Sequence, residues 1–410
     1  MPIHIEPHLI KIGLIGKTNV GKTTFFNSAT LLNAEISTRP FTTKQQNVGT
    51  AFAATLCVCR ELGVKDTPRN SACIDGWRFI PITIVDLPGL IKDAWAGKGL
   101  GNHFLNIAMR TDVLLHMVDA SGSINEKGEI TKPGTGDPIQ DVYDVEEEIA
   151  TWLANIIENN KATITKKLSS THHLDLALYK ILSGMKIKRN QIAQAIEKTC
   201  INKDFTDWTI EETKLLAKSI RKISKPTLIV ANKTDLPTAE DNIKRLSDTF
   251  KDTFIVPCSA ESELALRRAE KAKLIQYIPG EEIFRIIDKT KLTPRQLDAL
   301  DYVQKMTFTK WARTGVQYAI NLAIFKLLRM SAIYPVEDIT NYSDKKGRIL
   351  PDVILTQENS TVRDLAKKIH TDLAKTMIHA IDARTGLRLP KDYILRDRDI
   401  IKIVSAVEKK

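Results

Sequence analysis

A glycine-rich segment near the N-terminus constrains this chain more than any other feature of its sequence. Residues 9–15, LIKIGLI, are an apolar run with β-branched residues, which predicts a buried strand. The next eight residues match the phosphate-binding pattern G-x-x-x-x-G-K-[ST], and a helical pattern follows them. A strand, such a loop and a helix in this order predict a nucleotide-phosphate site, because backbone N–H groups and the positive end of the helix then face the phosphates. The expected nucleotide contacts are Gly16, Lys17, Thr18, Asn19, Val20, Gly21, Lys22, Thr23 and Thr24.

Side chains with expected chemical roles stand in this loop and after a second strand. Lys22 is expected to reach the β- and γ-phosphates and to act in catalysis, and the Thr23 hydroxyl to ligate Mg²⁺. The apolar residues 82–85, ITIV, end in Asp86-Leu-Pro-Gly89. The Asp86 carboxylate is placed to hold the hydration shell of Mg²⁺, and the Gly89 N–H can sense the γ-phosphate, which makes it a second catalytic candidate.

A third strand pattern, PTLIVA, is followed by Asn232-Lys233-Thr-Asp235. The Asp235 carboxylate can accept hydrogen bonds from the N1–H and the 2-amino group of guanine, and adenine lacks matching donors. Losing two charge-assisted hydrogen bonds of ~1.5–3 kcal/mol each predicts a roughly 10²–10⁴-fold preference for GTP over ATP. Asn232 is expected to tether this loop, and the aliphatic part of the Lys233 side chain is expected to cover the base. Further backbone contacts to the base are expected after a later strand, FIVPCSA, from Ser259 and Ala260.

The residues that would assist hydrolysis are less clearly marked. In the segment RPFTTKQQNVG, Thr42 and Thr43 are candidates for the switch threonine, and we prefer Thr43 as a metal ligand and catalytic residue; a plain polar loop is the alternative. Leu90 stands where many GTPases place a glutamine that orients water, so we expect slow intrinsic hydrolysis. Asn19 offers an amide oxygen that would suit a bound K⁺, or it simply stabilises the loop.

A long insertion separates two of these motifs. The 146 residues from Asp86 to Asn232 (232 − 86) far exceed the ~30 residues of one βαβ unit. Apolar residues at three-to-four spacing predict helices there, and Thr209-x-x-Glu212 is a capping-box signature. Residues 151–226 contain 14 Lys and Arg against 7 Asp and Glu. This surplus favours contact with RNA phosphates, although a merely solvated helical face is the alternative.

The predicted fold class is α/β, a P-loop G domain with a mostly parallel sheet and helices on both faces. An α-helical domain is inserted in it, and a β-helix-β-β series at the C-terminus resembles a ubiquitin-like β-grasp module. The predicted boundaries are 8–142 and 226–290 for the G domain, 143–225 for the inserted helices, 291–330 for a helical connector and 331–408 for the β-grasp domain.

Composition adds modest constraints. The formal net charge of +11 favours a polyanionic partner, and no apolar stretch of about 18 residues indicates a membrane span. Five cysteines scattered through the chain indicate reduced thiols in the cytoplasm. Cys57, Cys59 and Cys73 invite a metal interpretation, but no fourth ligand stands at a usual spacing, so we expect thiols that bind no metal. Nothing in the sequence demands more than a monomer.

Taken together, these motifs resemble a known family. The segments GKTNVGKTTFFN, RPFTTKQQNVG, DLPGLIKDAWAGKGLGNHFL and NKTD, with the C-terminal module, are similar to the Obg superfamily of translation-factor GTPases. The helical insertion after VLLHMVD, the early start of the G domain and a C-terminal TGS domain resemble its YchF-type members in an archaeal-like form. The related DRG-type GTPases, which also end in a TGS domain but carry sequence ahead of the G domain, are the nearest alternative family.

The resemblance implies several further properties. The implied partner is the ribosome, bound through the helical and TGS domains. The family replaces the catalytic glutamine by a hydrophobic residue, as at Leu90, and a histidine on the following strand has been proposed to act instead; His116 stands at that place, or is a packed strand residue. Many YchF-type members have a degraded NKxD and prefer ATP, whereas this chain keeps Asn232, Lys233 and Asp235. We therefore expect a GTP-hydrolysing switch; a binding protein with negligible hydrolysis and an ATP-preferring member are the alternatives.

Overall fold

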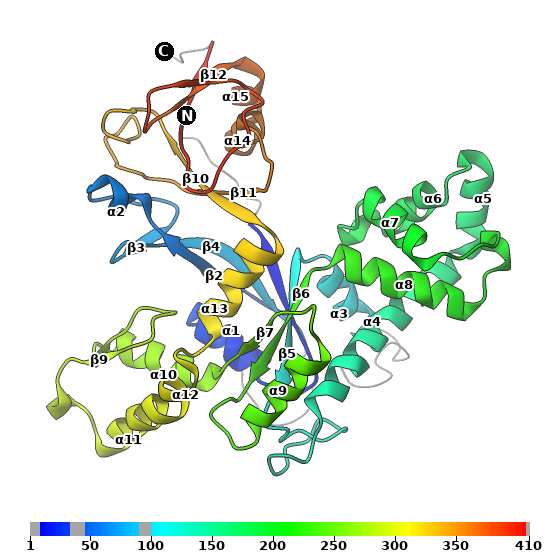
Figure 1. Cartoon of the computed structure of the whole chain (residues 1–410), viewed down its shortest axis with the longest axis horizontal. Helices are drawn as coiled ribbons and strands as arrows, with labels where there is room; N and C mark the ends of the chain where they lie inside the picture. The colour runs from blue at the N-terminus through cyan, green and yellow to red at the C-terminus, as the bar shows by residue number, and fades with distance from the viewer. Residues whose placement is uncertain (1–8, 33–45, 90–99, 407–410) are drawn as a thin grey trace. The chain divides into compact units, whose positions relative to one another are not determined.

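The structure is a computed structural model of the whole chain (Figure 1). The described residues fall into two compact units. The larger lies within residues 11–49 and 83–319, and the smaller is built mainly from residues within 50–82 and 320–410. The described residues are 9–32, 46–89 and 100–406.

A seven-stranded sheet carries the phosphate-binding loop. Its strand order is β2-β4-β1-β5-β6-β7, with the short strand β3 antiparallel to β4. β1 pairs in parallel with β4 and β5, and β6 pairs in parallel with β5 and β7. All seven residues of β5 are buried, as expected for a parallel strand covered on both faces. The strands are β1 Lys11–Ile15, β2 Asn47–Leu56, β3 Ala72–Ile74, β4 Trp77–Asp86, β5 Val113–Asp119, β6 Thr227–Asn232 and β7 Ile255–Pro257.

Helices cover this sheet. α3, α4 (Pro138–Asn159) and α8 (Ile210–Ser224) share one hydrophobic core with residues of β1, β4 and β5, and α9 packs on β5 and β6. α1 packs against α10. A parallel sheet covered by helices, with the phosphate loop between β1 and α1, confirms the predicted α/β P-loop fold class. These helices are α1 Lys22–Thr30, α3 Leu100–Met109, α9 Ala239–Thr249 and α10 Ala260–Lys271, and the smaller unit adds α2 Val58–Leu62.

Five consecutive helices fill most of the insertion between β5 and β6 (Figure 1). α4 begins at Pro138, because the Asp137 side chain accepts a hydrogen bond from the Ile139 N–H and proline suits the first helical position. This start lies ahead of the predicted boundary at 143. Leu153 of α4 is fully buried in the core of the helical segment. The helices are α4 Pro138–Asn159, α5 Lys161–Thr171, α6 Leu174–Leu182, α7 Arg189–Thr199 and α8 Ile210–Ser224.

Short elements connect α10 to the C-terminal domain. Within the predicted helical connector, α11 runs on into a π-helical turn. Their core includes Tyr277, whose hydroxyl donates to the buried Glu263 carboxylate (2.7 Å). The elements are β8 Ile275–Gln276, β9 Arg285–Ile286, α11 Pro294–Val303, the π-turn Gln304–Phe308, α12 Thr309–Trp311, α13 Val316–Asn321 and the π-turn Leu322–Leu327.

The C-terminal residues form a second sheet of five strands, in the order β11-β10-β14-β12-β13. β10 pairs in parallel with β14, and α14 packs on the sheet, which is the predicted β-grasp arrangement. The predicted β-helix-β-β series is wrong in one respect: His370 adopts an extended backbone and divides its helix in two. The elements are β10 Met330–Val336, β11 Ile354–Gln357, α14 Val362–Ile369, α15 Thr371–Thr376, β12 Met377–Asp382, β13 Arg388–Leu389 and β14 Ile400–Ser405.

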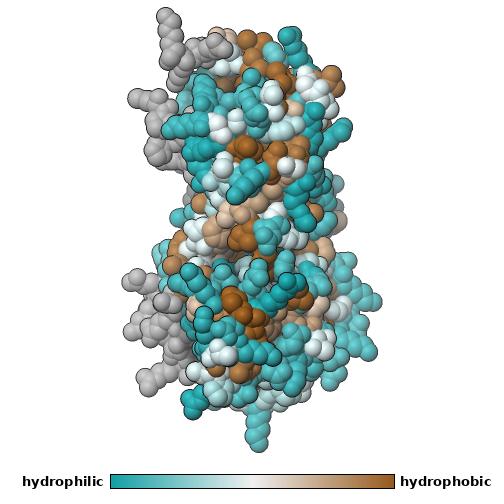
Figure 2. Space-filling model, turned by 90° about the vertical axis from the view of Figure 1, so that its left-hand side faces the viewer, coloured by the Kyte–Doolittle hydropathy of each residue, from teal (hydrophilic) through white to brown (hydrophobic). Residues whose placement is uncertain are grey.

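The surface carries no broad apolar area on the face drawn in Figure 2, where the hydrophobic side chains of the described residues form small groups among hydrophilic ones. Within the described ranges, no helix has the length and apolar character needed to cross a membrane.

The predicted capping box at the start of α8 is confirmed and can be tested directly. Thr209 Oγ1 accepts a hydrogen bond from the Glu212 N–H (3.2 Å), and the Glu212 carboxylate accepts one from the Thr209 N–H (2.8 Å). We expect Thr209→Ala to weaken this end of α8 by about 1 kcal/mol, which corresponds to roughly fivefold faster amide exchange in its first turn. Thr209→Ser keeps the hydroxyl oxygen and should restore the protection. Equal exchange rates in both variants, measured by hydrogen–deuterium exchange, would contradict this role of the hydroxyl.

Candidate functional site

The phosphate-binding loop leaves β1 at the carboxyl end of the parallel strands, where α/β proteins bind their ligands. Gly16 has a φ of +141°, and a Cβ there would lie 2.3 Å from the Met117 carbonyl oxygen of β5. Gly21 has a φ of +98°, and its Cβ would lie 2.2 Å from Asn232 Nδ2. Both positions therefore require glycine, for a backbone conformation and for a close approach. The loop is packed between β5 and the predicted base-recognition motif.

Lys22 occupies the first position of α1 and its side chain curls back over the loop. Its Nζ donates to the carbonyl oxygens of Gly16 (3.0 Å) and Lys17 (2.6 Å). Burial lowers the pKa of Lys22 to about 8, and the Asp86 carboxylate opposes this shift. An ammonium group held among carbonyl oxygens is placed to exchange them for phosphate oxygens, as expected for a P-loop lysine.

The residues predicted to hold Mg²⁺ lie together. Thr23 Oγ1 donates to Asp86 Oδ2 (2.7 Å), and Asn47 Nδ2 donates to the same oxygen (3.2 Å). Asp86 is buried, and its Oδ1 has no hydrogen-bond partner among the described residues. Burial raises the pKa of Asp86, against the attraction of the nearby Lys22. A buried carboxylate oxygen without a partner, beside a threonine hydroxyl, fits the oxygen ligands that Mg²⁺ prefers.

The switch segments are described only in part. Gly89 lies against the phosphate loop, since a Cβ on it would come within 2.6 Å of Thr18 Cα. This position brings the end of the Asp86–Gly89 motif to the phosphate loop, as predicted. Thr42, Thr43 and Leu90 lie outside the described residues. The roles predicted for them stay predictions.

The base-recognition motif is tied to two other loops by one side chain. Asn232 Nδ2 donates to the Val20 carbonyl oxygen (2.8 Å), and its Oδ1 accepts from the Ala260 N–H (3.0 Å). Ser259 Oγ donates to Asp235 Oδ1 (2.8 Å). Within the described chain no hydrogen bond reaches Asp235 Oδ2, which leaves this oxygen for a guanine donor. The structure thus brings together four of the predicted base contacts, namely Asn232, Asp235, Ser259 and Ala260.

Lys233 is held by residues that the sequence motifs did not single out. Its Nζ contacts Asp119 Oδ2 (3.0 Å) and Ser123 Oγ (3.2 Å). Asp119 ends β5, and its carboxylate also accepts hydrogen bonds from the backbone and hydroxyl groups of Ser121 and Ser123. The sequence signal was available, because aspartate followed by serines at a strand end is typical of a side-chain-stabilised turn.

The loop that begins with this turn also reaches the phosphate loop. The Gly128 carbonyl oxygen accepts hydrogen bonds from Asn19 Nδ2 (2.9 Å) and Thr18 Oγ1 (3.3 Å). This contact supports the loop-stabilising role that we considered for Asn19. Residues 121–138 are rich in glycine and proline, but no sequence pattern indicated that this loop would lie beside the phosphate loop.

Lys17 links the phosphate loop to the helical segment. Its Nζ forms ion pairs with Asp141 (2.7 Å) and Asp144 (2.8 Å), both on α4, and the Lys17 side chain is only 6% exposed. Burial disfavours the charged lysine, but the two carboxylates together raise the pKa of Lys17, so it stays ionised. From the sequence we expected Lys17 only as a nucleotide contact, and no pattern predicted this connection.

His116, the candidate catalytic histidine, is buried in β5. Its Nδ1 lies 3.9 Å from Glu146 Oε1, an oxygen that also accepts a hydrogen bond from Arg221 Nη2 (2.8 Å). Neither ring nitrogen has a hydrogen-bond partner among the described residues. Burial, with Arg221 and Lys22 nearby, lowers the pKa of His116 to about 3, so the ring is neutral near pH 7. The ring thus lies against residues of α4 and α8.

Comparison with known protein families covers most of the chain. Residues 11–165 match the family described as 50S ribosome-binding GTPase. Residues 230–338 match the G4 motif-containing domain of the Obg-like GTPase YGR210-like family, and residues 339–405 match the TGS domain.

Similar proteins extend over the full length. A GTP-binding protein of Methanocaldococcus jannaschii is 45% identical over 97% of this chain and 99% of its own length. The crystal structure of a GTP-binding protein from Pyrococcus horikoshii OT3 has 34% identity and a TM-score of 0.75, and covers 97% of this chain and 100% of its own. The chain belongs to the Obg-like, YchF-type GTPases. A more distant relative in Bacillus subtilis, 28% identical over 66% of this chain and 71% of its own length, is named ribosome-binding ATPase YchF.

Membership of the YchF-type GTPases confirms the resemblance inferred from the motifs, including the C-terminal TGS domain. The chain is a GTP-binding protein of this family, and the family implies nucleotide hydrolysis. One relative is named as an ATPase, so membership of the family does not by itself define the preferred nucleotide.

The role of Asp235 in base choice leads to a first prediction for the site. We expect Asp235→Asn to weaken GTP binding roughly 10²–10⁴-fold, since the carboxylate acceptor for two guanine donors is lost. Binding of xanthosine triphosphate should improve, because the new amide can donate to its 2-carbonyl group. The measurement is the Kd of each nucleotide with Mg²⁺. The matched control is Asp241→Asn at an exposed position of α9, which should change neither Kd. Unchanged GTP affinity in the Asp235 variant would contradict the assignment.

The two interpretations of His116 make different predictions for hydrolysis. From its contacts and its neutral state we expect His116→Asn to hydrolyse bound GTP in a single turnover within about threefold of the wild-type rate. A general base at this position would instead contribute about 10²–10⁴-fold. The wild-type rate should also show no titration near pH 6.5, the ordinary pKa of histidine. A roughly hundredfold lower hydrolysis rate in the variant, with an unchanged Kd for GTP, would restore the catalytic interpretation.

Proposed function

We propose that this YchF-type protein is a cytoplasmic GTP-hydrolysing switch that acts on the ribosome or its RNA. The observation that carries the proposal is the pairing of Lys17, in the phosphate loop, with Asp141 and Asp144 at the start of the helical segment. A bound phosphate chain adds negative charge next to Lys17 and competes with these two carboxylates. The nucleotide state therefore changes the forces that hold α4, the first helix of the basic segment.

Nucleotide binding and hydrolysis follow from the residues of the loop. The N–H groups of the phosphate loop and the Lys22 ammonium hold the phosphates, while Asp235 selects guanine. Mg²⁺, held through Thr23 and Asp86, would neutralise charge on the β- and γ-phosphates. In the proposal Thr43 and Gly89 complete the site around the γ-phosphate. With Leu90 in place of a water-orienting glutamine, hydrolysis without a partner is slow, and K⁺ or the ribosome supplies the missing stabilisation.

Guanine specificity is supported by the arrangement of the base motif. Asn232 and Ser259 hold the loop and one oxygen of Asp235, so the second oxygen keeps a fixed direction. Adenine would leave this partly buried carboxylate without a donor. The relative named as an ATPase makes ATP the competing nucleotide to include in every binding measurement.

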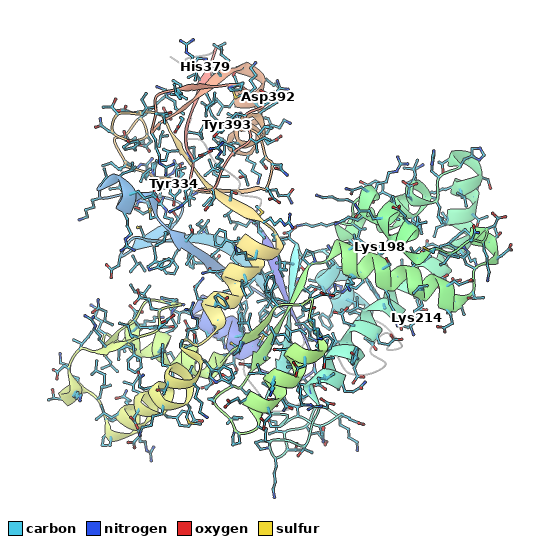
Figure 3. All side chains as sticks on the ribbon, in the orientation of Figure 1. Lys198, Lys214, Tyr334, His379, Asp392 and Tyr393 are labelled. Atoms are coloured by element: carbon cyan, nitrogen blue, oxygen red, sulfur yellow. The ribbon has the colours of Figure 1, made fainter. Side chains whose placement is uncertain are left out.

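The partner is inferred from charge and from the names of relatives. Of the 14 basic residues between 151 and 226, Arg221 and Lys225 are buried and hold the fold together, so the surface surplus is smaller than the sequence count. Figure 3 labels Lys198 on α7 and Lys214 on α8; Lys214 is paired with Glu147, and Lys198 has no ion pair among the described residues. The exposed lysines without such a pair in the described part of this segment are Lys166, Lys180, Lys188, Lys198 and Lys222. A relative and a matched family both carry ribosome binding in their names.

A second candidate function is a nucleotide-gated RNA- or ribosome-binding protein with negligible hydrolysis. The observation in its favour is Leu90, which cannot orient water. Single-turnover GTP hydrolysis by the monomeric protein, with and without K⁺ and ribosomal subunits, separates the two functions. An increase in the hydrolysis rate by several orders of magnitude supports the switch, and a rate that stays near the unassisted value supports the binding protein.

The lysines of the helical segment generate a direct test of the proposed partner. We expect the triple variant Lys180→Glu, Lys198→Glu and Lys222→Glu to bind ribosomal subunits or RNA at least tenfold more weakly in the GTP state. The number of counterions released on binding, read from the salt dependence of the Kd, should fall by about one for each lysine that contacts phosphate. The measurement is the Kd at several salt concentrations.

The control carries the same charge change elsewhere, as Lys244→Glu, Lys251→Glu and Lys271→Glu at exposed positions of the larger unit. Equal losses in the two triple variants would show only a general charge effect and would contradict a binding role of the helical segment.

A further inference from the structure

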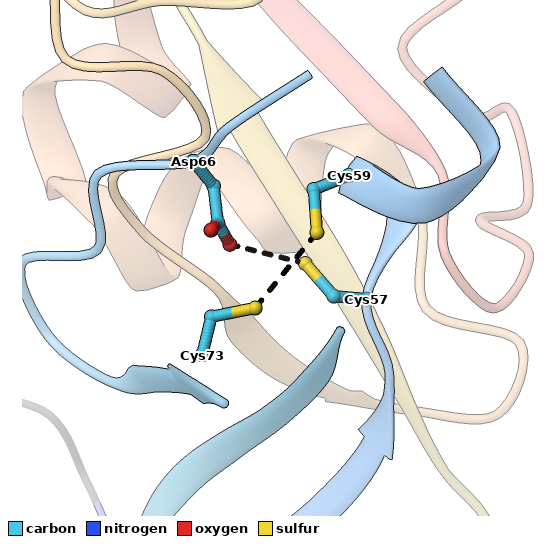
Figure 4. A group of neighbouring side chains, drawn as sticks. All are labelled: Cys57, Cys59, Asp66 and Cys73. Carbon is cyan, nitrogen blue, oxygen red and sulfur yellow. Dashed lines mark hydrogen bonds between the residues drawn. The ribbon is translucent and has the colours of Figure 1, made fainter. Parts of the chain in front are cut away.

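A cluster of thiols outside the nucleotide site forms a compact ligand set in the smaller unit. Cys57 and Cys59 lie at the start of α2, Cys73 lies on β3, and Asp66 lies in the loop between these elements (Figure 4). Their side-chain ligand atoms, three Sγ and one carboxylate oxygen, all lie within 4.8 Å of one another. No part of the nucleotide-binding role uses these residues.

Two distances within the cluster are close to those of a tetrahedral metal site, and all the others are within 4.8 Å. Cys59 Sγ and Cys73 Sγ are 3.8 Å apart, and Cys57 Sγ lies 3.3 Å from Asp66 Oδ2. With Zn–S bonds of about 2.3 Å and Zn–O bonds of about 2.0 Å, tetrahedral angles place two ligand sulfurs about 3.8 Å apart and a sulfur and an oxygen about 3.5 Å apart. Small side-chain movements are therefore enough to bring the four atoms onto one ion.

The surroundings close the site and supply an opposite charge. Cys57 and Cys59 are buried in a hydrophobic cluster that includes Val58 and residues of the C-terminal sheet. Arg78, which is fully buried, donates through Nη1 to Asp66 Oδ2 (2.7 Å) and through Nη2 to the Leu350 carbonyl oxygen (2.6 Å). The net charge of the occupied site would be −1, from three thiolates, one carboxylate, a divalent ion and this guanidinium. Without Arg78 it would be −2.

Arg78 also has the position of a supporting residue for a metal ligand. A ligand carboxylate in a protein metal site is normally held by a further hydrogen bond, as Asp66 is here. The Arg78 guanidinium carbon lies 5.6 Å from the ring centroid of the buried Tyr334, on β10. An ion bound at the cluster would therefore link residues 57–78 through Arg78 to the C-terminal sheet of the same unit.

We propose that Cys57, Cys59, Cys73 and Asp66 form a structural Zn²⁺ site. Three sulfur ligands favour zinc over the oxygen-preferring Mg²⁺ and Ca²⁺, and four protein ligands leave no open position, as in a structural site. Binding releases to solvent any proton that these thiols still carry, up to three, and changes no oxidation state. The expectation of thiols without metal, which rested on the lack of a fourth ligand at a usual spacing, is revised because the fold brings Asp66 to the three sulfurs.

Two metal-free states of the cluster are alternative outcomes of the test. The thiols can hold no metal and be hydrogen-bonded instead, with Cys57 donating to Asp66. Cys59 and Cys73 could instead form a disulfide, although their 3.8 Å separation is far from the roughly 2.05 Å of an S–S bond. Both states would leave the protein without stoichiometric zinc.

The experiment begins with the full-length protein, purified under reducing conditions without added chelator. We expect one zinc per chain by elemental analysis, and after replacement by Co²⁺ we expect thiolate-to-cobalt charge-transfer absorption with the d–d bands of a tetrahedral site. Cys73→Ser should weaken Zn²⁺ binding at least 100-fold, because loss of a direct ligand matters more than the 10–100-fold of a supporting residue. Its cobalt charge-transfer intensity should fall by about one-third, because two of three thiolates remain.

The matched control is Cys200→Ser, at an exposed cysteine outside the cluster, which should leave metal content and spectrum unchanged. Asp66→Asn keeps all three thiols and should weaken Zn²⁺ binding while preserving the charge-transfer intensity of the cobalt form. If the Cys73 variant does not fold, the test is to remove zinc from the wild-type protein with a chelator. We then expect faster amide exchange in residues 57–78, and we expect added Zn²⁺ to reverse this change.

The proposal is overturned by any of three results. The first is a purified wild-type protein that neither contains zinc nor binds added Zn²⁺ or Co²⁺. The second is a Cys59–Cys73 disulfide found by mass spectrometry in the reduced preparation. The third is a cobalt spectrum that is the same in wild type and Cys73→Ser. GTP affinity measured in parallel is expected to stay unchanged on loss of zinc.

Discussion

The nucleotide site depends on one amide side chain. Asn232 holds the phosphate loop through the Val20 carbonyl and the start of α10 through the Ala260 N–H, so three segments far apart in the chain share one fixed point. Its closeness is also the reason why position 21 excludes a side chain. An aspartate in place of Asn232 would lose the hydrogen-bond donor to the Val20 carbonyl and would place a negative charge beside the phosphates. The geometry of base recognition and of phosphate binding is therefore set by the same residue.

The sequence predicted the parts of the site that depend on local pattern. The phosphate loop, Asp86–Gly89 and Asn232–Asp235 each directly follow a buried strand, and the parallel pairing of β4, β1, β5 and β6 brings the carboxyl ends of these strands to one edge. Local chemistry together with this topology was enough to place these motifs near one another. The fold class followed from the phosphate-loop motif between a strand and a helix, and the C-terminal β-grasp domain from the order of its predicted strands and helix.

What the sequence did not predict are pairings between residues far apart in the chain. Nothing in the spacing of Lys17 and Asp141 indicates that they meet, and Gly128 contributes only a backbone oxygen to Asn19. Charge counting also overstated the basic surface, because it cannot distinguish a solvated lysine from Lys225, whose ammonium is buried and donates to the Thr111 carbonyl. In addition, the extended backbone of His370 ended a helix that periodicity alone would continue.

The ion pairs of Lys17 have a consequence for the energetics of any partner. If the nucleotide alters the affinity of the helical segment for a partner by some factor, then the partner must alter the affinity for that nucleotide by the same factor, because the two equilibria form a closed thermodynamic cycle. A partner that favours the form with Lys17 paired to Asp141 and Asp144 would promote nucleotide release, and one that favours the unpaired form would retain the nucleotide. In the proposed switch, two carboxylates on α4 would thus couple nucleotide exchange to partner binding in both directions.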